Sequence, residues 1–266
     1  MTDLTLERVS YCYPDGGALA LDGIDLHIAA GERVALIGQN GSGKTTLVRH
    51  LNGLLRPSSG RVLHDGSDVA ARTVARLARS VGLAFQDPDR QIFAGSVRRE
   101  VEFGPRNLGL SGAALRAAVD EALAEAGLAA EAGTNPYDLG ASRRKLLALA
   151  SVQAMRTPVL VLDEPTTGQD MRGVATVKRV IDAARAAGRS VIAISHDMGF
   201  VAESFDRVVV LRAGKVILDG TPAVVFGRAS WDALRSTYLE PPLPAIVGSR
   251  LGVDATPTDA ELLAAL

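Results

Sequence analysis

The stretch from Gly38 to Thr46 has the composition of a phosphate-binding loop. It reads Gly-Gln-Asn-Gly-Ser-Gly-Lys-Thr-Thr, so one glycine and four variable residues precede Gly-Lys-Thr, which is the phosphate-loop template. Glycines let the backbone turn sharply and point successive N–H groups at one anion. Lys44 can reach the β- and γ-phosphates of a nucleotide, and the Thr45 hydroxyl can bind Mg²⁺. The predicted nucleotide-binding residues of this stretch are Gly38, Gln39, Asn40, Gly41, Ser42, Gly43, Lys44, Thr45 and Thr46.

The residues on either side supply the elements that such a loop needs. The apolar run 34–37 is long enough for one buried strand, and residues 46–51 have apolar side chains at helical spacing. A loop between a strand and a helix lies at the positive end of the helix, where anions bind. This context favours a phosphate site over the alternative, an ordinary glycine-rich turn with a solvated lysine.

An acidic pair, Asp163 and Glu164, directly follows the apolar run 159–162. Such a run is typical of a central parallel strand, buried on both faces. With a phosphate loop upstream, Asp163 is expected to bind Mg²⁺ and Glu164 to activate water. The alternative is that the two carboxylates only cap the next helix.

Gln86 and His196 also stand at the ends of apolar runs, 81–85 and 191–194. In open α/β sheets, ligands bind beyond the carboxyl ends of the strands. We therefore expect Gln86 on the Mg²⁺ and water side of the site and His196 at a phosphate. A solvated loop glutamine is the alternative for Gln86.

The rest of the pattern predicts an α/β fold: a P-loop NTPase core with an antiparallel β subdomain, an inserted α-helical subdomain and a small C-terminal appendage. Residues 4–10 and 23–28 alternate like strands, and Ala- and Leu-rich helical patterns fill about 88–156. We place the main domain at 1–222 and the appendage at 223–266.

Local signals mark three further elements. Ser142 is a plausible cap for a helix that begins near Gly140. The segments 208–211 and 216–218 are predicted to form a hairpin. Thr258, followed three residues later by a glutamate, is a capping box for a terminal helix.

Composition narrows the function classes. Lys and Arg total 29 against 30 Asp and Glu, so no excess of basic charge indicates nucleic-acid binding. Cys12 is the single cysteine, which excludes an internal disulfide and indicates a reducing compartment. The first residues lack a secretory-signal pattern, and no uncharged apolar run reaches about 18 residues. We expect a soluble cytoplasmic chain.

In their order and approximate spacing, these residues resemble the ATP-binding-cassette (ABC) ATPases. The positions that carry the resemblance are Tyr13, the loop 38–46, Gln86, Asp163-Glu164, Asp170 and His196. The resemblance implies that Tyr13 stacks on adenine and that Gln86 senses Mg²⁺ and the attacking water. It also implies Glu164 as the base, His196 at the γ-phosphate and Asp170 in contact across a dimer. Two such domains would sandwich two ATP molecules.

Two segments, 85–93 and 102–110, together with the tail 220–245, are similar to the ATPase subunits of energy-coupling factor (ECF) importers. This narrower resemblance implies an importer for a vitamin or for cobalt or nickel ions. It implies a second ABC ATPase subunit, in a homo- or heterodimer, and two membrane partners: a transmembrane coupling subunit and a substrate-binding subunit. The chain would then lie peripherally at the cytoplasmic face of the cell membrane.

The stretch Leu139 to Arg143 departs from the ABC pattern Leu-Ser-Gly-Gly-Gln, since it reads Leu-Gly-Ala-Ser-Arg. We hypothesise that Ser142, helix N–H groups and Arg143 replace the usual contact with the γ-phosphate held by the opposite subunit. One alternative is a regulatory half-site subunit that closes on ATP but hydrolyses it weakly. Another is a soluble ABC ATPase outside transport, which the lack of a duplicated cassette, a long coiled coil and a basic face disfavours.

Overall fold

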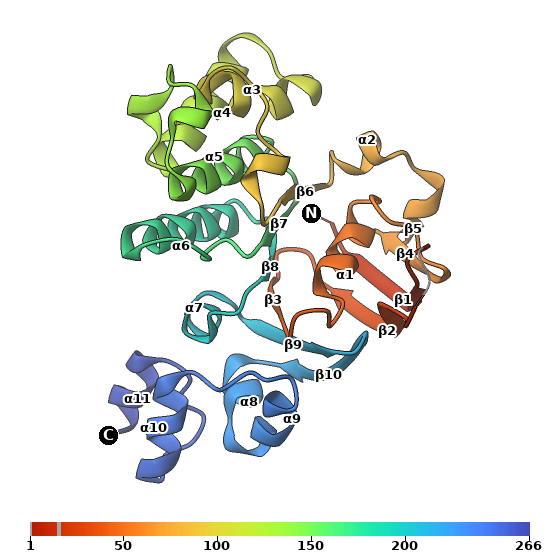
Figure 1. Ribbon diagram of the computed structural model, residues 1–266, viewed down its shortest axis with the longest axis vertical. Helices are drawn as coiled ribbons and strands as arrows, with labels where there is room; N and C mark the ends of the chain where they lie inside the picture. Colours follow the sequence, from red (N-terminus) through yellow and green to blue (C-terminus); the bar gives the residue numbers. More distant parts are fainter. Residues whose placement is uncertain (1, 15–16) are drawn as a thin grey trace.

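The computed structural model describes residues 2–14 and 17–266, which form two β-sheets with helices packed around them (Figure 1). The strands are β1 Leu4–Tyr11, β2 Leu21–Ile28, β3 Arg33–Ile37, β4 Ser59–His64, β5 Ser67–Asp68, β6 Val81–Ala84, β7 Val159–Asp163, β8 Ser190–Ile194, β9 Arg207–Arg212 and β10 Lys215–Gly220. The helices are α1 Lys44–Leu51, α2 Val74–Leu77, α3 Val97–Asn107, α4 Gly112–Glu125, α5 Ala141–Gln153, α6 Met171–Ala186, α7 Met198–Ser204, α8 Pro222–Phe226, α9 Trp231–Arg235, α10 Leu243–Leu251 and α11 Asp259–Ala265.

The larger sheet has the strand order β10-β9-β3-β8-β7-β6. Its strands from β9 to β6 are parallel, and β10 pairs antiparallel with β9 at one edge. Every residue of β3, β7 and β8 is buried. In β3, Ala35 and Ile37 pack into one hydrophobic core and Val34 and Leu36 into another. Both faces of the sheet are therefore covered, which is why these strands read as unbroken apolar runs.

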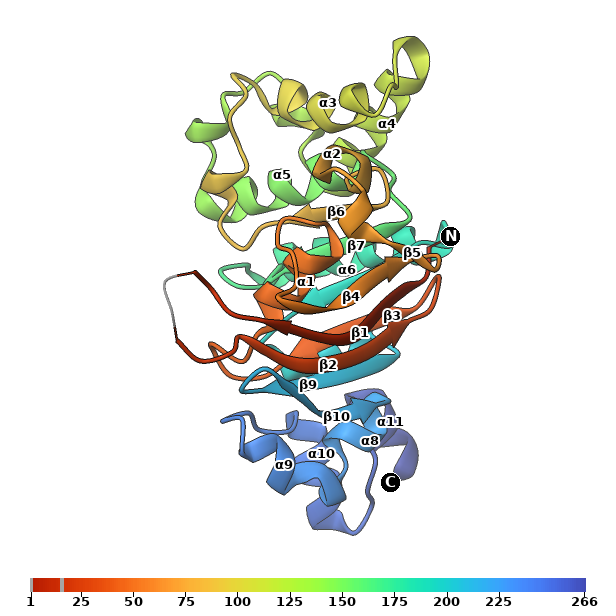
Figure 2. The ribbon, with the colours of Figure 1, turned by 90° about the vertical axis from the view of Figure 1, so that its right-hand side faces the viewer.

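The smaller sheet, β2-β1-β4-β5, is antiparallel throughout. Leu4 and Leu6 of β1 share a core with Leu36 of β3 and with Leu47 and Leu51 of α1. The small sheet thus covers the face of the large sheet on which α1 lies, as the layers in Figure 2 show. The strands predicted at 4–10 and 23–28 are confirmed as β1 and β2.

Helices α3, α4 and α5 form a separate layer beyond β6 and β7, at the top of Figure 1. All three helices lie within 88–156, the range in which the sequence shows helical patterns. The predicted cap of α5 was wrong: Gly140, not Ser142, occupies the N-cap position, with extended backbone angles and no side-chain cap bond. Ser142 lies within the first turn, and its hydroxyl donates instead to Gln169 Oε1 at 2.7 Å.

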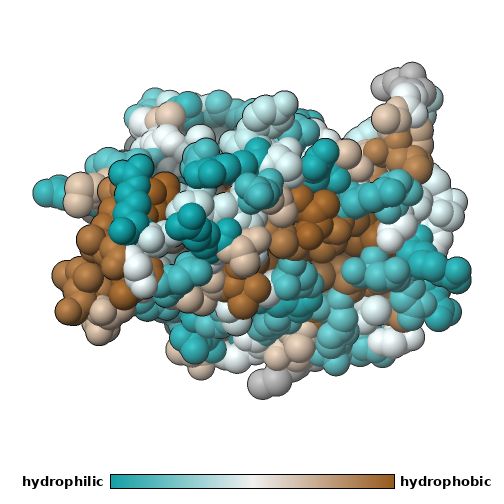
Figure 3. Space-filling model, turned by 90° about the horizontal axis from the view of Figure 1, so that it is seen from below, coloured by the Kyte–Doolittle hydropathy of each residue, from teal (hydrophilic) through white to brown (hydrophobic). Residues whose placement is uncertain are grey.

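The chain ends in α8 to α11, after the hairpin β9–β10, which has the predicted antiparallel pairing. Phe226 of α8 is fully buried in the core beneath the large sheet. The capping box of α11 is present, with Thr258 and Glu261 bonding to each other's backbone N–H. Figure 3 views this end of the molecule and shows apolar groups on its surface. The exposed apolar side chains of these helices and their links are Val224, Tyr238, Leu243, Leu251 and Leu263.

Across the described ranges, no helix has both the length and the apolar character needed to cross a membrane.

Candidate nucleotide-binding site

The loop 38–43 joins β3 to α1, as its template requires. Gly43 is the N-cap of α1 and has a left-handed φ of 105°, which favours glycine. A Cβ on Gly38 would lie 2.1 Å from the carbonyl oxygen of Leu211 in β9, so the loop packs directly on the neighbouring strand. Glycine at these positions lets the loop close over the end of the sheet and begin α1 with its N–H groups facing outward.

A cavity of about 480 Å³ lies above this loop. It brings together side chains from the segment after β1, from the loop, and from the carboxyl ends of β6, β7 and β8. Its lining residues are Tyr13, Ala20, Asn40, Gly41, Ser42, Gly43, Lys44, Thr45, Thr46, Gln86, Asp163, Glu164, Thr167, Ile194 and His196. Of the predicted loop residues, Gly38 and Gln39 lie outside the lining but contact Lys44.

The Lys44 ammonium is held at the base of this loop. Its Nζ donates to the carbonyl oxygens of Gly38 at 2.6 Å and Gln39 at 2.9 Å. Burial lowers the pKa of Lys44, and the charges of Glu164 and Asp163 oppose that effect. The ammonium therefore lies among oxygen acceptors and near the charges of two carboxylates.

Thr45 and Asp163 form a pair of oxygen ligands suited to Mg²⁺. Thr45 Oγ1 donates to Asp163 Oδ2 at 3.2 Å, whereas Asp163 Oδ1 is buried and has no hydrogen-bond partner among the described residues. Burial raises the pKa of Asp163. In the described ranges no group of three or more His, Cys, Asp or Glu could hold a metal. An unpartnered carboxylate oxygen beside a hydroxyl suits an ion that takes one carboxylate and completes its shell with phosphate and water, as Mg²⁺ does.

Glu164 and His196 come together from adjacent strands. Glu164 Oε1 lies 3.2 Å from His196 Nε2, at ion-pair distance, and Glu164 Oε2 accepts from the Thr167 hydroxyl at 3.1 Å. The backbone of Glu164 is left-handed, with φ 53°, while its N–H extends the β7–β8 pairing to the carbonyl of Ile194. Burial raises the pKa of Glu164, and the His196 charge opposes this rise. A buried carboxylate of raised pKa, held in a strained backbone conformation, is suited to accept a proton.

Tyr13 stands at the mouth of the cavity. Its side chain is 39% exposed, and its hydroxyl lies 3.0 Å from Thr46 Oγ1. The ring is therefore tied to α1, although it precedes that helix by about 30 residues. A base could pack on this ring while the loop holds the phosphates.

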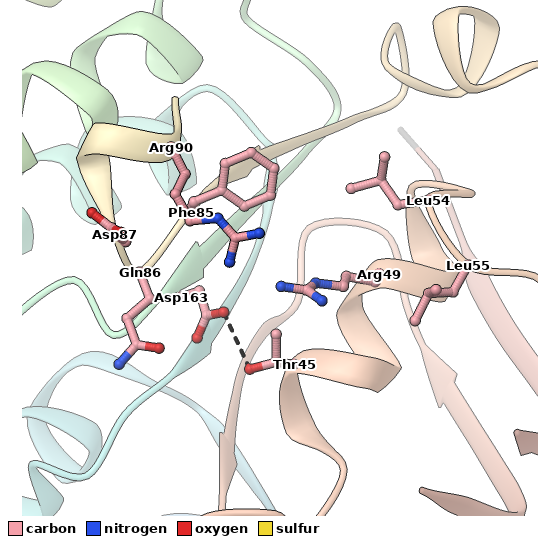
Figure 4. Close-up of a pocket in the computed structure, with 9 residues that line it drawn as sticks. All are labelled: Thr45, Arg49, Leu54, Leu55, Phe85, Gln86, Asp87, Arg90 and Asp163. Carbon is pink, nitrogen blue, oxygen red and sulfur yellow. Dashed lines mark hydrogen bonds between the residues drawn. The ribbon is translucent and has the colours of Figure 1, made fainter. Parts of the chain in front are cut away.

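A second cavity, of about 330 Å³, lies beside the first and shares Thr45, Gln86 and Asp163 with it. In Figure 4, the guanidinium groups of Arg49 and Arg90 point into the gap between α1 and the loop after β6. Gln86 thus lies between the two cavities. The remaining lining residues of the second cavity are Leu54, Leu55, Phe85 and Asp87.

Beyond the loop, three predicted site residues lie outside the first cavity. Asp170 caps α6 by accepting from the N–H of Gly173 at 2.7 Å. Ser142 is bonded to Gln169. The Arg143 guanidinium pairs with Glu131 and donates to the Gly127 carbonyl at 2.8 Å.

Thr167 and Lys145 belong to the site but were not predicted from the sequence. Besides bonding Glu164, Thr167 accepts from Lys145 Nζ at 2.9 Å through its carbonyl oxygen. Burial lowers the pKa of Lys145, with Glu164 and Asp163 opposing. The spacing of Thr167 three residues after Glu164 was the available signal, but only the turn after β7 brings the hydroxyl back to the carboxylate.

Comparison with known proteins gives a consistent set of relatives. The ABC transporter family profile matches residues 21–167. The chain is 42% identical over 269 residues to "Energy-coupling factor transporter ATP-binding protein EcfA1" of Symbiobacterium thermophilum, covering 98% of this chain and 93% of that protein. It is 40% identical to "Cobalt import ATP-binding protein CbiO" of Rhodobacter capsulatus, covering 90% and 85%.

Among solved structures, cbiO1 of Clostridium perfringens, described as part of the ABC transporter complex cbiONQ, superposes with a TM-score of 0.76 and 37% identity. The match covers 94% of this chain and 98% of that one. Some curated relatives are much longer: the chain spans 41% and 42% of the length of two "Putative ABC transporter ATP-binding protein" sequences from Methanosarcina species.

Proposed function

The chain belongs to the ABC transporter family of ATPases, and from this premise we propose that it is the ATP-hydrolysing subunit that powers an ECF-type importer. The substrate class we propose is a vitamin or a transition-metal ion. Relatives whose names refer to energy coupling and to cobalt import support this reading. The single observation that carries the hydrolytic role is the 3.2 Å approach of Glu164 to His196 beside the loop of Lys44.

The proposed division of labour follows from the positions of the side chains. The loop amides and Lys44 bind the phosphates, and Glu164 accepts a proton from the attacking water. His196, whose Nε2 lies 3.2 Å from Glu164 Oε1, contacts the γ-phosphate and orients that carboxylate. Thr45, Asp163 and Gln86 would hold Mg²⁺, which supplies positive charge against the phosphate oxygens. Most of the rate gain would come from positioning and charge stabilisation.

We place Tyr13 against the adenine and Asp170, Ser142 and Arg143 towards a second ATPase subunit. One observation favours a second candidate, the regulatory half-site: Arg143 is already engaged by Glu131 and the Gly127 carbonyl. A contact from Arg143 to a partner's nucleotide would have to replace both. In that case the chain would close on ATP while supporting slow turnover in its partner.

The membrane partners would bind near the second cavity, on the helical side of Gln86. Phe93 and Phe103 line a separate hollow of the helical subdomain, where they are 59% and 50% exposed, and their rings pack edge to face at 4.7 Å. An exposed aromatic pair beside the charged groups of Arg99, Glu102 and Arg106 suits an amphipathic helix of a transmembrane coupling subunit. A chain docked in this way would lie peripherally at the cytoplasmic face of the membrane.

Steady-state phosphate release from the chain, purified with its membrane partners, tests the proposal. Glu164→Gln should lower the rate at least about 100-fold while keeping ATP binding within about twofold, because only the proton acceptor is lost. Glu203→Gln is the matched control, since Glu203 pairs with Lys178 away from the cavity. Appreciable hydrolysis by the Glu164 variant would exclude the assigned base. Slow hydrolysis by the unaltered chain in a heterodimer would favour the half-site instead.

A further inference from the structure

A closed circle of contacts, called the contact ring below, joins Tyr11, Tyr13, Thr46 and His50 beneath the mouth of the cavity. Tyr11 packs edge-on against Tyr13, with ring centroids 5.0 Å apart, and against His50, with centroids 4.9 Å apart. Tyr13 reaches Thr46 through its hydroxyl, and His50 reaches the same residue through its ring nitrogen. The contact ring therefore links the end of β1 to two successive turns of α1, and its only well-exposed member is Tyr13.

The chemistry of His50 fits a fixed support. His50 Nδ1 lies 2.7 Å from the Thr46 carbonyl oxygen, and because a carbonyl only accepts, Nδ1 carries the proton. Nε2 is buried and has no hydrogen-bond partner among the described residues. The side chain is fully buried, and burial lowers its pKa, so the imidazole stays neutral. A neutral imidazole packs on an aromatic ring without bringing a charge into the core.

The clamp on Thr46 acts from two sides. Its hydroxyl is met by Tyr13 and its carbonyl by His50, while Tyr11 fills the space between the two rings. Without these contacts the Tyr13 side chain, which is partly exposed, would be free to rotate about its side-chain bonds. The contact ring removes that rotational freedom before a ligand binds, and pre-organisation of this kind raises the affinity for the ligand without adding a contact.

We propose that His50, acting with Tyr11, is a positioning residue for the recognition of adenine by Tyr13. This inference rests on the proposed role of Tyr13 in stacking on the base. The site then has two parts. The loop binds the triphosphate, and the contact ring sets the orientation of the Tyr13 side chain on which the base stacks. Loss of His50 should therefore weaken binding of an adenine nucleotide and spare a ligand made only of phosphates.

Calorimetric titration of the full chain with Mg²⁺-ATP and with Mg²⁺-tripolyphosphate tests this separation. His50→Asn, which removes the imidazole, should weaken ATP binding about three- to tenfold and change tripolyphosphate binding less than about twofold. In turnover assays, KM for ATP should rise by the same factor and kcat should stay unchanged. His50→Phe, which keeps an aromatic edge on Tyr11, should restore most of the ATP affinity.

His64→Asn is the matched control. His64 is also fully buried and also bonds a carbonyl, with Nε2 2.8 Å from the Leu51 oxygen, but it lies in β4 and is no member of the contact ring. This variant should bind both ligands like the unaltered chain. If His50→Asn does not fold, Tyr11→Leu, which removes the other contact of Tyr13, carries the same expectation.

The possible outcomes are distinct. Equal weakening of both ligands by His50→Asn would mean that the loop itself had moved, and unchanged ATP binding would mean that the contact ring is not needed; either result overturns the inference. Tyr13→Ala distinguishes its failure from that of the proposed function. If Tyr13→Ala leaves ATP binding unchanged, the stacking role fails; if it weakens ATP binding and His50→Asn does not, only the positioning role fails.

Discussion

Substituting alanine at two glycines of one loop should give very different results. At Gly38, φ is 144° and a Cβ would lie 2.1 Å from the Leu211 carbonyl oxygen, where ordinary contacts begin at 3.4 Å. The loop or β9 must then shift by about 1.3 Å, because the obstacle is backbone and cannot rotate away. At Gly41, φ is 76° and a Cβ would meet nothing within 4 Å.

The magnitudes follow from these geometries. Gly41→Ala adds only the cost of a left-handed alanine, about 1–2 kcal/mol, which lowers the unfolding temperature of a protein of this size by about 2–8 °C. Gly38→Ala adds an overpacking cost of about 1–3 kcal/mol to a similar backbone strain. The sum is about 2–5 kcal/mol, so its unfolding temperature should fall further, to about 4–20 °C below that of the unaltered chain. Since a displacement of about 1 Å can lower turnover about 100-fold, its ATPase activity should also be lost.

Thermal unfolding of the nucleotide-free variants measures the first effect without interference from a ligand. Titration with ATP and phosphate release then measure the second. If Gly38→Ala unfolds at the same temperature as Gly41→Ala and still turns over ATP, the packing of the loop on β9 has been misjudged.

Three further outcomes are expected. Glu164→Gln should raise the free energy of unfolding of the nucleotide-free chain by about 1 kcal/mol at neutral pH, because it removes a buried charge. This gain should vanish as pH falls towards the usual glutamate pKa. Destabilisation of the variant at neutral pH would contradict the prediction. Asp206→Asn should lower the free energy of unfolding by about 1 kcal/mol at neutral pH, a value discounted for the exposure of Asp206, because Arg33 donates to both Asp206 oxygens and lowers the pKa of this carboxyl. In the unaltered chain this stabilisation is lost as pH falls through the lowered pKa. A stability difference between the two proteins that persists in strong acid would refute the pairing. Burial lowers the pKa of His50 and His64. Less urea should therefore be needed for unfolding as pH falls below about 6.5, where the unfolded chain takes up protons that the folded chain excludes. A urea midpoint that stays constant between about pH 7.5 and about pH 5.5 would contradict neutral buried imidazoles.

Much of the site could be predicted because its signals are local. The loop 38–46 is a contiguous template, and the apolar runs before Gln86, Asp163 and His196 mark buried parallel strands by composition alone. The rule that polar residues at strand ends share one edge of a sheet then groups them without any knowledge of strand order.

What the tertiary structure decided is which of these ends are neighbours and where other side chains are used. The parallel pairing of β7 with β8 puts Glu164 beside His196. Arg143, which a motif comparison places at a nucleotide, is held by Glu131. No sequence pattern predicts the contact ring that includes Tyr11 and His50, because only folding brings β1 and α1 together.

The sequence by itself therefore determined the loop that matches the phosphate-binding template and the apolar runs that form β3, β6, β7 and β8, since each depends on residues close together in the chain. The tertiary structure alone decided the pairing of Glu164 with His196, the engagement of Arg143 and the support beneath Tyr13. These depend on contacts between residues distant in sequence, and neither periodicity nor spacing records them.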